Sequence, residues 1–164
     1  MKNYFLPKIF LLFLITVFSC SRGEKKGTGL ANSFRFEEYT ITQLQQGYDN
    51  GDFTVKDVVQ AYLDRIAAID DKGPMLNAVI QVNPDALAIA GQLDQELKDG
   101  KKRGPMHGVP VLLKDNIDTH DQMATTAGSR ALAGSHPLND SYVAMRLREA
   151  GAVIIGKANL SEWA

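Results

Sequence analysis

The longest amphipathic pattern in the chain begins at Thr54. From there apolar residues recur at spacings that place them on one stripe of a helix: Val55, Val58, Val59, Tyr62, Ile66 and Ile69. Thr54 and Asp57 stand at the start of this stripe with the spacing of a capping box, in which two side chains satisfy free backbone N–H groups. We therefore predict a helix that packs one face on a protein core, and a shorter helix before it, around Thr42 to Gly47.

A short β-prone run and a second helical pattern follow. The run covers Ala78 to Val82, and Asn83-Pro84 after it supplies an N-cap residue and a proline suited to the first helical position. The inner face of the predicted helix is apolar: Ala86, Ile89, Ala90, Leu93 and Leu97. Asp99-Gly100 is expected to end it. The order to this point is helix, strand, helix.

Two further apolar runs predict a pair of parallel strands. Val109 to Leu113 and Ala152 to Ile155 are both short and apolar, and a helix that begins after Asp140 and ends at Gly151 separates them. A strand, a crossover helix and a strand imply parallel pairing. Lys114 and Lys157 would then both lie at the carboxyl ends of the strands, the edge at which open α/β sheets bind ligands.

The lysine that ends the first of these runs has two interpretations. Lys114 follows Leu112 and Leu113, so its apolar stem can lie along the sheet while its ammonium group reaches water. The alternative is that the protein uses this amine in chemistry. The segment from Asp115 to Leu138 is longer than loops without a function usually are, which favours a site there.

Three stretches decide between these interpretations: residues 104–118 (GPMHGVPVLLKDNID), 125–129 (TTAGS) and 151–164 (GAVIIGKANLSEWA). In order and spacing they resemble the opening third of the amidase signature family, and within it the bacterial amidases related to peptide amidase. The likeness runs from about Tyr39 to Ala164. It implies an α/β fold, with a mixed sheet covered by helices on both faces, of which this sequence carries the amino-terminal part.

The resemblance also implies an activity and a catalytic residue. Such enzymes hydrolyse a carboxamide C–N bond to a carboxylate and ammonia through an acyl-serine intermediate. Lys114 matches the family's catalytic lysine. The cis-serine and the nucleophilic serine of the family lie downstream, in a Gly/Ser-rich segment that this sequence does not reach, so we expect residues 1–164 alone to be inactive. Four serines near the motifs are not in a G-x-S-x-G context and are read as loop or capping residues: Ser129, Ser135, Ser141 and Ser161.

A lysine acts as a general base only when it is neutral, and an unperturbed lysine has a pKa of about 10.4. Burial behind Leu112 and Leu113 would lower the pKa of Lys114, and a second cation at Lys157 would lower it further. Asp115 points to the opposite face if the strand alternates regularly. We expect supporting roles for Asp115, Asn116 and Lys157. The candidates for the substrate cleft are Thr125, Thr126, Gly128 and Ser129, whose alternative role is turn formation.

Residues 1–20 are predicted to be a signal peptide of the lipoprotein type. Lys2 and Lys8 precede an apolar run, residues 9–18, that is too short to cross a bilayer. The run ends at Cys20, the one cysteine of the chain, in a context that resembles a lipobox. A lone cysteine forms no internal disulfide, so lipid attachment is the interpretation we favour over a secretory signal beside a chance cysteine. Residues 21–38 are predicted to be a flexible tether and residues 39–164 the amidase domain, exported to a bacterial cell envelope and anchored to a membrane.

Composition narrows the partners. The chain has 18 basic and 19 acidic residues, and removal of residues 1–20 would leave 16 against 19, a net charge of −3. This balance gives no reason to expect nucleic acid binding. The histidines His107, His120 and His136 have no metal-ligand spacing, so neither a metal nor a cofactor is expected. We expect a small-molecule or peptide amide substrate, and the oligomeric state stays open. Two alternatives remain: the amidase subunit that supplies ammonia to an aminoacyl-tRNA, and a non-catalytic lipoprotein that keeps an amidase-like binding surface.

Overall fold

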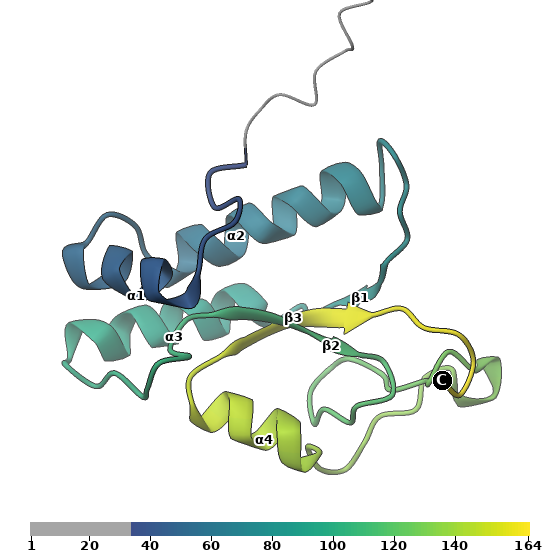
Figure 1. The fold of residues 1–164 in the computed structure, drawn as a ribbon. Helices are drawn as coiled ribbons and strands as arrows, with labels where there is room; N and C mark the ends of the chain where they lie inside the picture. Colours follow the sequence, from purple (N-terminus) through teal and green to yellow (C-terminus); the bar gives the residue numbers. More distant parts are fainter. Residues whose placement is uncertain (1–33) are drawn as a thin grey trace, which may run out of the picture. The chain divides into compact units, whose positions relative to one another are not determined.

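The computed structural model describes residues 34–164 (Figure 1). The elements in chain order are α1 (Ile41–Asn50), α2 (Val55–Arg65), a π-helical turn (Ile66–Asp70), β1 (Val79–Val82), α3 (Ala86–Lys98), β2 (Pro110–Lys114), a 3-10 turn (Arg130–Leu132), α4 (Tyr142–Glu149) and β3 (Val153–Ala158). Within residues 34–164, no helix has the length and apolar character needed to span a bilayer. The predictions on residues 1–20, Cys20 included, lie outside the described residues.

The three strands form one mixed sheet in the order β1-β3-β2. β3 is central, pairs parallel with β2 and antiparallel with β1, and is buried along nearly its whole length. The predicted parallel pair is therefore confirmed. Because β1 and β2 are both edge strands of the sheet formed by residues 34–164, their outer sides have no strand beside them in this part of the chain.

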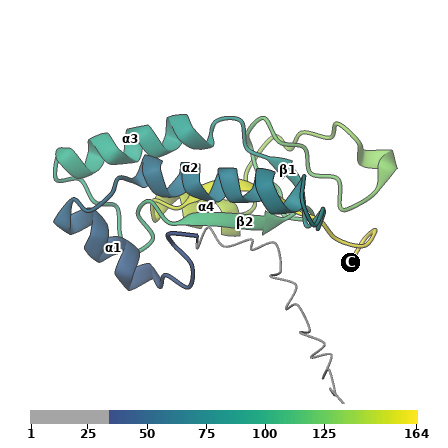
Figure 2. The same cartoon turned by 90° about the horizontal axis from the view of Figure 1, so that it is seen from above.

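Helices cover both faces of this sheet, as predicted. α2 and α3 pack on the face from which Val153 and Ile155 project, while α4 lies on the opposite face against Leu113 and Ile154 (Figures 1 and 2). Alternation along β3 thus divides its apolar side chains between two cores. The larger core also includes Phe36, Leu44 and residues of α2 and α3, and the smaller one includes Met123 and Ala144.

The amphipathic stripes predicted the helices well. Thr54 and Asp57 form the expected capping box of α2, and the stripe continues to Ile69 because the helix ends in the π-helical turn. α1 is longer than the predicted segment at both ends. It has its own capping box between Thr40 and Gln43, which the polar composition of this segment concealed.

Two predicted helix starts are wrong for the same reason. Asn83 lies outside α3, which begins at Ala86 with Asp85 at the cap position. The Asn83 side chain binds on both sides: its oxygen accepts from the Asp85 amide at 2.9 Å, and its amide donates to the carbonyl of Ile154 at 2.7 Å. Asp140 accepts a hydrogen bond from the His120 amide and does not cap α4. Ser141 takes that role through the amide of Ala144.

The packed part of the chain begins earlier than the predicted boundary at residue 39. Phe36 is 1% exposed, and its ring lies 5.0 Å from that of Phe53 and 5.4 Å from that of Tyr39 between ring centroids. Residues 34–38 therefore belong to the packed body and not to a tether. The aromatic residues at 34 and 36 were a signal for this, because a flexible linker seldom carries them.

Candidate functional site

Lys114 ends β2 at the edge of the sheet, as predicted. Its side chain is exposed, and its Nζ donates a hydrogen bond to the backbone carbonyl of Ala164 at 3.1 Å. The side-chain amide of Asn116 donates to the same oxygen at 2.8 Å. The side chains of Lys114 and Asn116 therefore lie on the same side of the strand end. The expected burial of Lys114 is absent within residues 34–164, because β2 is an edge strand of this sheet and Leu112 before it is itself 41% exposed.

Lys157 is the opposite case, a lysine with no exposed surface. Its Nζ donates to the carbonyl of Ile117 at 2.8 Å and to the hydroxyl of Thr125 at 2.9 Å. Burial lowers the pKa of Lys157 because desolvation penalises the charged form, while Asp115, Asp121 and Asp118 act in the opposite direction through their negative charges.

The two lysines project to opposite faces of the sheet. Lys157 is in register with Leu113, whose side chain contributes to the core beneath α4, and Lys114 is in register with Ala158. Alternation along β2 turns Lys114 to the other face. The supporting role expected from the sequence is a direct effect of the positive charge of Lys157 on Lys114. Placement on opposite faces of the sheet does not favour such a direct effect.

Asp115 is buried behind the strand end and binds the loop that follows. Its carboxylate accepts hydrogen bonds from the amide of Thr126 at 3.2 Å and from the Thr126 hydroxyl. Its backbone carbonyl accepts from the amide of Ala127, and its own amide donates to the carbonyl of Ala158, both at 3.0 Å. Asp115 therefore joins β2, β3 and the loop at residues 125–129, which is a supporting position.

The four cleft candidates lie together in that loop, but two of their side chains point into the protein. Thr125 and Ser129 are buried; the Thr125 hydroxyl binds Lys157, and the Ser129 hydroxyl donates to Glu162 at 2.7 Å. Thr126 is half-buried against Asp115. Gly128 has φ +70°, and a side chain there would press on the backbone of residues 160 and 162. The geometry thus gives Thr125 and Ser129 a part in fastening the loop.

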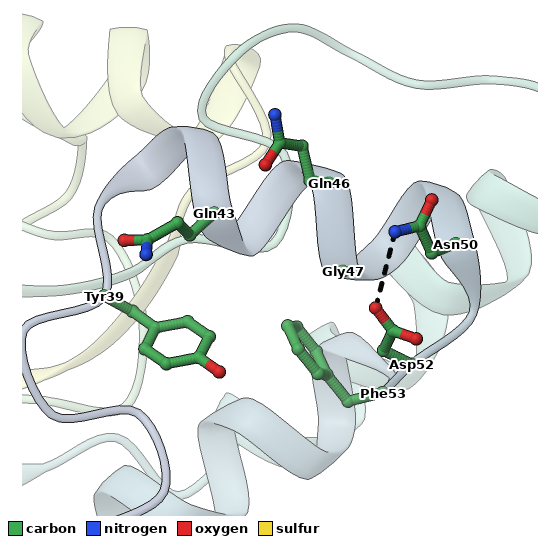
Figure 3. Close-up of a pocket in the computed structure, with 7 residues that line it drawn as sticks. All are labelled: Tyr39, Gln43, Gln46, Gly47, Asn50, Asp52 and Phe53. Atoms are coloured by element: carbon green, nitrogen blue, oxygen red, sulfur yellow. Dashed lines mark hydrogen bonds between the residues drawn. The ribbon is translucent and has the colours of Figure 1, made fainter.

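A pocket on α1 and the turn after it contains none of the predicted site residues (Figure 3). It is lined by Tyr39, Gln43, Gln46, Gly47, Asn50, Asp52 and Phe53. The side-chain amide of Asn50 faces the carboxylate of Asp52 across it at 3.5 Å. These groups satisfy each other and include no nucleophile with an adjacent base, so we place the candidate site at the strand ends.

None of the three histidines is hydrogen-bonded to Lys114, Asp115 or Lys157 in the part of the chain that the structure describes. His107 is fully buried, where its Nδ1 accepts from the Arg103 amide and its Nε2 contacts the carbonyl of Leu93, so both ring nitrogens have structural partners. Among residues 34–164, no three His, Cys, Asp or Glu side chains are grouped as a metal site would require.

Two contributors to the site were missed in the sequence. Glu162 fastens Ser129, and it lies in the stretch at residues 151–164 that had already been singled out. The carbonyl of Ile117 holds Lys157, and no sequence signal exists for a backbone acceptor of this kind.

Known proteins resemble this chain along most of its length. A family model described as Amidase matches residues 57–164. Native peptide amidase from Stenotrophomonas maltophilia superposes with a TM-score of 0.78 at 53% identity, over 80% of this chain and 26% of that enzyme. A relative in Arabidopsis thaliana named as a probable amidase is 44% identical over 98% of this chain and 31% of its own length.

The similarity extends to an enzyme that acts with tRNA. A glutamyl-tRNA(Gln) amidotransferase subunit from Alkaliphilus metalliredigens is 43% identical over 79% of this chain and 26% of its own length. The chain spans between about a fifth and a third of these and similar curated relatives.

Proposed function

The chain belongs to the amidase family, and from this premise we propose that it forms the amino-terminal part of an amidase that converts a carboxamide to a carboxylate and ammonia. The observation that carries the proposal is the likeness to peptide amidase, at 53% identity over 80% of the chain. The family-model match over residues 57–164 covers both strand ends and the loop at residues 125–129. A peptide amide or a similar small amide is therefore the proposed substrate.

Lys114 is the proposed general base. Its place at the carboxyl end of a parallel strand supports this role, as does the exposure of its side chain there. In the proposed reaction the neutral amine of Lys114 takes the proton of a serine relay, and a serine oxygen forms a bond to the amide carbon. The C–N bond breaks as the nitrogen receives that proton and leaves as ammonia. Water then attacks the acyl-serine ester and releases the carboxylate.

Both serines of this scheme are proposed to lie outside residues 1–164. The serines near the site have other partners: Ser129 binds Glu162 and Ser141 caps α4. Residues 21–164 expressed alone are therefore expected to release no ammonia. Asp115, Asn116 and the loop at residues 125–129 would act by holding the strand end in place.

The likeness to the amidotransferase raises the alternative of an aminoacyl-tRNA substrate. Its identity to this chain is lower than that of peptide amidase, and the proposed export signal at residues 1–20 argues for a substrate outside the cytosol. We therefore favour free amides. A non-catalytic lipoprotein remains the outcome if no hydrolysis is found.

Anchoring through lipid on Cys20 is proposed from the sequence alone. A Cys20→Ser variant, expressed in a bacterial host with a fatty-acid probe, should lose the label and leave the membrane fraction. Label that persists on the variant would contradict the anchor.

The test of the function is ammonia release from a panel of peptide amides by the full-length protein. Lys114→Ala should lower turnover by about 10² to 10⁴, the usual cost of removing a general base. Lys98→Ala, at the exposed end of α3, is the matched control and should keep the wild-type rate. A Lys114→Ala enzyme with near-normal turnover would contradict the assignment.

A further inference from the structure

Lys157 is a buried cation that the proposed chemistry does not use. It is fully buried, and its two partners are a carbonyl and a hydroxyl; within residues 34–164 no carboxylate lies within ion-pair distance of it. A buried charge held only by neutral oxygens costs stability. Proteins tend to keep a costly feature of this kind, such as a buried charge without a counter-charge, at functional sites.

The hydrogen bonds of Ile117 lead from Lys157 to Lys114. The amide of Ile117 donates to the carbonyl of Lys114 at 3.0 Å, which closes the turn directly after β2. The carbonyl of the same residue accepts the Lys157 ammonium at 2.8 Å. One peptide unit on each side of Ile117 thus links the end of β2 to a side chain of the central strand.

The second partner of Lys157 fixes the other border of the site. Thr125 accepts from Lys157 through its hydroxyl, and the next residue, Thr126, is held by the buried carboxylate of Asp115. The turn after Lys114 and the loop at residues 125–129 are therefore both tied to β3, the most buried strand. A strand end that few hydrogen bonds hold is otherwise free to move.

We propose that Lys157 is a positioning residue for Lys114: its ammonium group holds the turn through Ile117 and the loop through Thr125, and so fixes the strand end from which the Lys114 amine acts. The inference rests on the proposed function, because it assigns Lys157 a role in that reaction through Lys114. Lys157 touches neither substrate nor the reacting atoms. Its contribution is to geometry.

The experiment compares variants of the full-length enzyme on one peptide amide. Turnover is normalised to active sites by the acyl-enzyme burst where Lys114 is intact, and to folded protein in the Lys114→Ala background. Lys157→Met keeps the length of the side chain and removes the ammonium. Turnover should fall by about 10², the cost of a displacement of about 1 Å at a reacting group, while KM changes little.

A second pair of variants covers the case in which Lys157→Met does not fold. Thr125→Val removes only the hydroxyl acceptor, and Thr125→Ser retains it. Turnover should fall in the first variant and stay close to wild type in the second, with KM little changed in both. In a Lys114→Ala background, Lys157→Met should lower the residual rate no further, because the two residues act through one group.

The outcomes separate this inference from the proposed function. Normal turnover per active site in Lys157→Met and Thr125→Val, with only a lower melting temperature, would overturn the positioning role. A further rate loss in the Lys114→Ala background would overturn it as well. Near-normal turnover in Lys114→Ala would overturn the proposed function first, and the inference with it.

Discussion

Removal of the Arg148 guanidinium should weaken the contact between α4 and the loop at residues 119–123 more than any exposed ion pair of the same helix. Arg148 binds two carboxylates, Asp121 at 2.6 Å and Asp140 at 3.0 Å. The side chain of Arg148 is 25% exposed, that of Asp121 8% and that of Asp140 18%, so solvent screens these charges only in part. The second oxygen of each carboxylate accepts hydrogen bonds from the loop, including the amides of Met123 and His120.

The magnitude follows from this partial burial. Exposed pairs contribute about 0 to 1 kcal/mol, and loss of one partner of a buried pair costs about 3 to 5 kcal/mol. Arg148→Met leaves two close carboxylates without their cation, one of them buried, so we expect a loss of about 2 to 3 kcal/mol. Arg146 is the matched control: it lies on the same helix and pairs with Glu149, with side chains 61% and 52% exposed. Arg146→Met should cost less than about 0.5 kcal/mol.

Hydrogen exchange followed by mass spectrometry measures the local loss of stability in the full-length protein. The opening free energy of the peptides that cover residues 119–123 and α4 should fall in Arg148→Met and stay close to wild type in Arg146→Met. Equal changes in the two variants would refute the argument from burial. A loss below about 0.5 kcal/mol in Arg148→Met would do the same.

Two further predictions concern stability. Gly91→Ala in α3 should stabilise the protein by about 0.5 to 1 kcal/mol, since no atom would crowd the new methyl group and alanine favours a helix. Gly156→Ala should destabilise the protein, because the new carbon would lie 2.5 Å from the carbonyl oxygen of Gln81, and urea unfolding that ranks the two variants the other way would contradict both expectations. Burial lowers the pKa of Lys157 below the value of about 10.4 that it has in the unfolded chain. Between these two pKa values the unfolded chain binds more protons than the folded protein. The contribution of Lys157 to stability should therefore become more favourable as pH rises through this window. Burial also raises the pKa of Tyr48, which lowers the stability of every variant at alkaline pH. The measurement is therefore the difference in unfolding free energy between wild type and Lys157→Met at each pH. A difference that does not change with pH would contradict the argument that Lys157 is a buried cation.

The sequence was informative wherever local pattern and burial agree. The stripe after Thr54 predicted α2, and the two apolar runs that flank the α4 segment predicted the parallel pair, because both elements are stabilised mainly by the face they bury. The position of Lys114 at a strand end followed from the length of its apolar run.

The errors occur where a polar side chain has a distant partner. Asn83 is a good helix cap in isolation, but it binds the carbonyl of Ile154 across the sheet, 71 positions away. Asp140 likewise binds the loop and Arg148. The site shows the same limit: Lys157 was recognised as a charge near Lys114, but its burial and its acceptors depend on which face of β3 meets the loop. Local pattern does not encode that choice.

The central claim, an acyl-serine amidase with Lys114 as its base, is tested most directly by trapping the acyl-enzyme. The full-length protein would be mixed with a peptide amide, quenched in acid within the first turnover and digested for mass spectrometry. The account predicts an acyl adduct on a serine outside residues 1–164, present in wild type and in Lys98→Ala and absent in Lys114→Ala. An adduct on Ser129 or another serine of residues 34–164, or an undiminished adduct in Lys114→Ala, would contradict it.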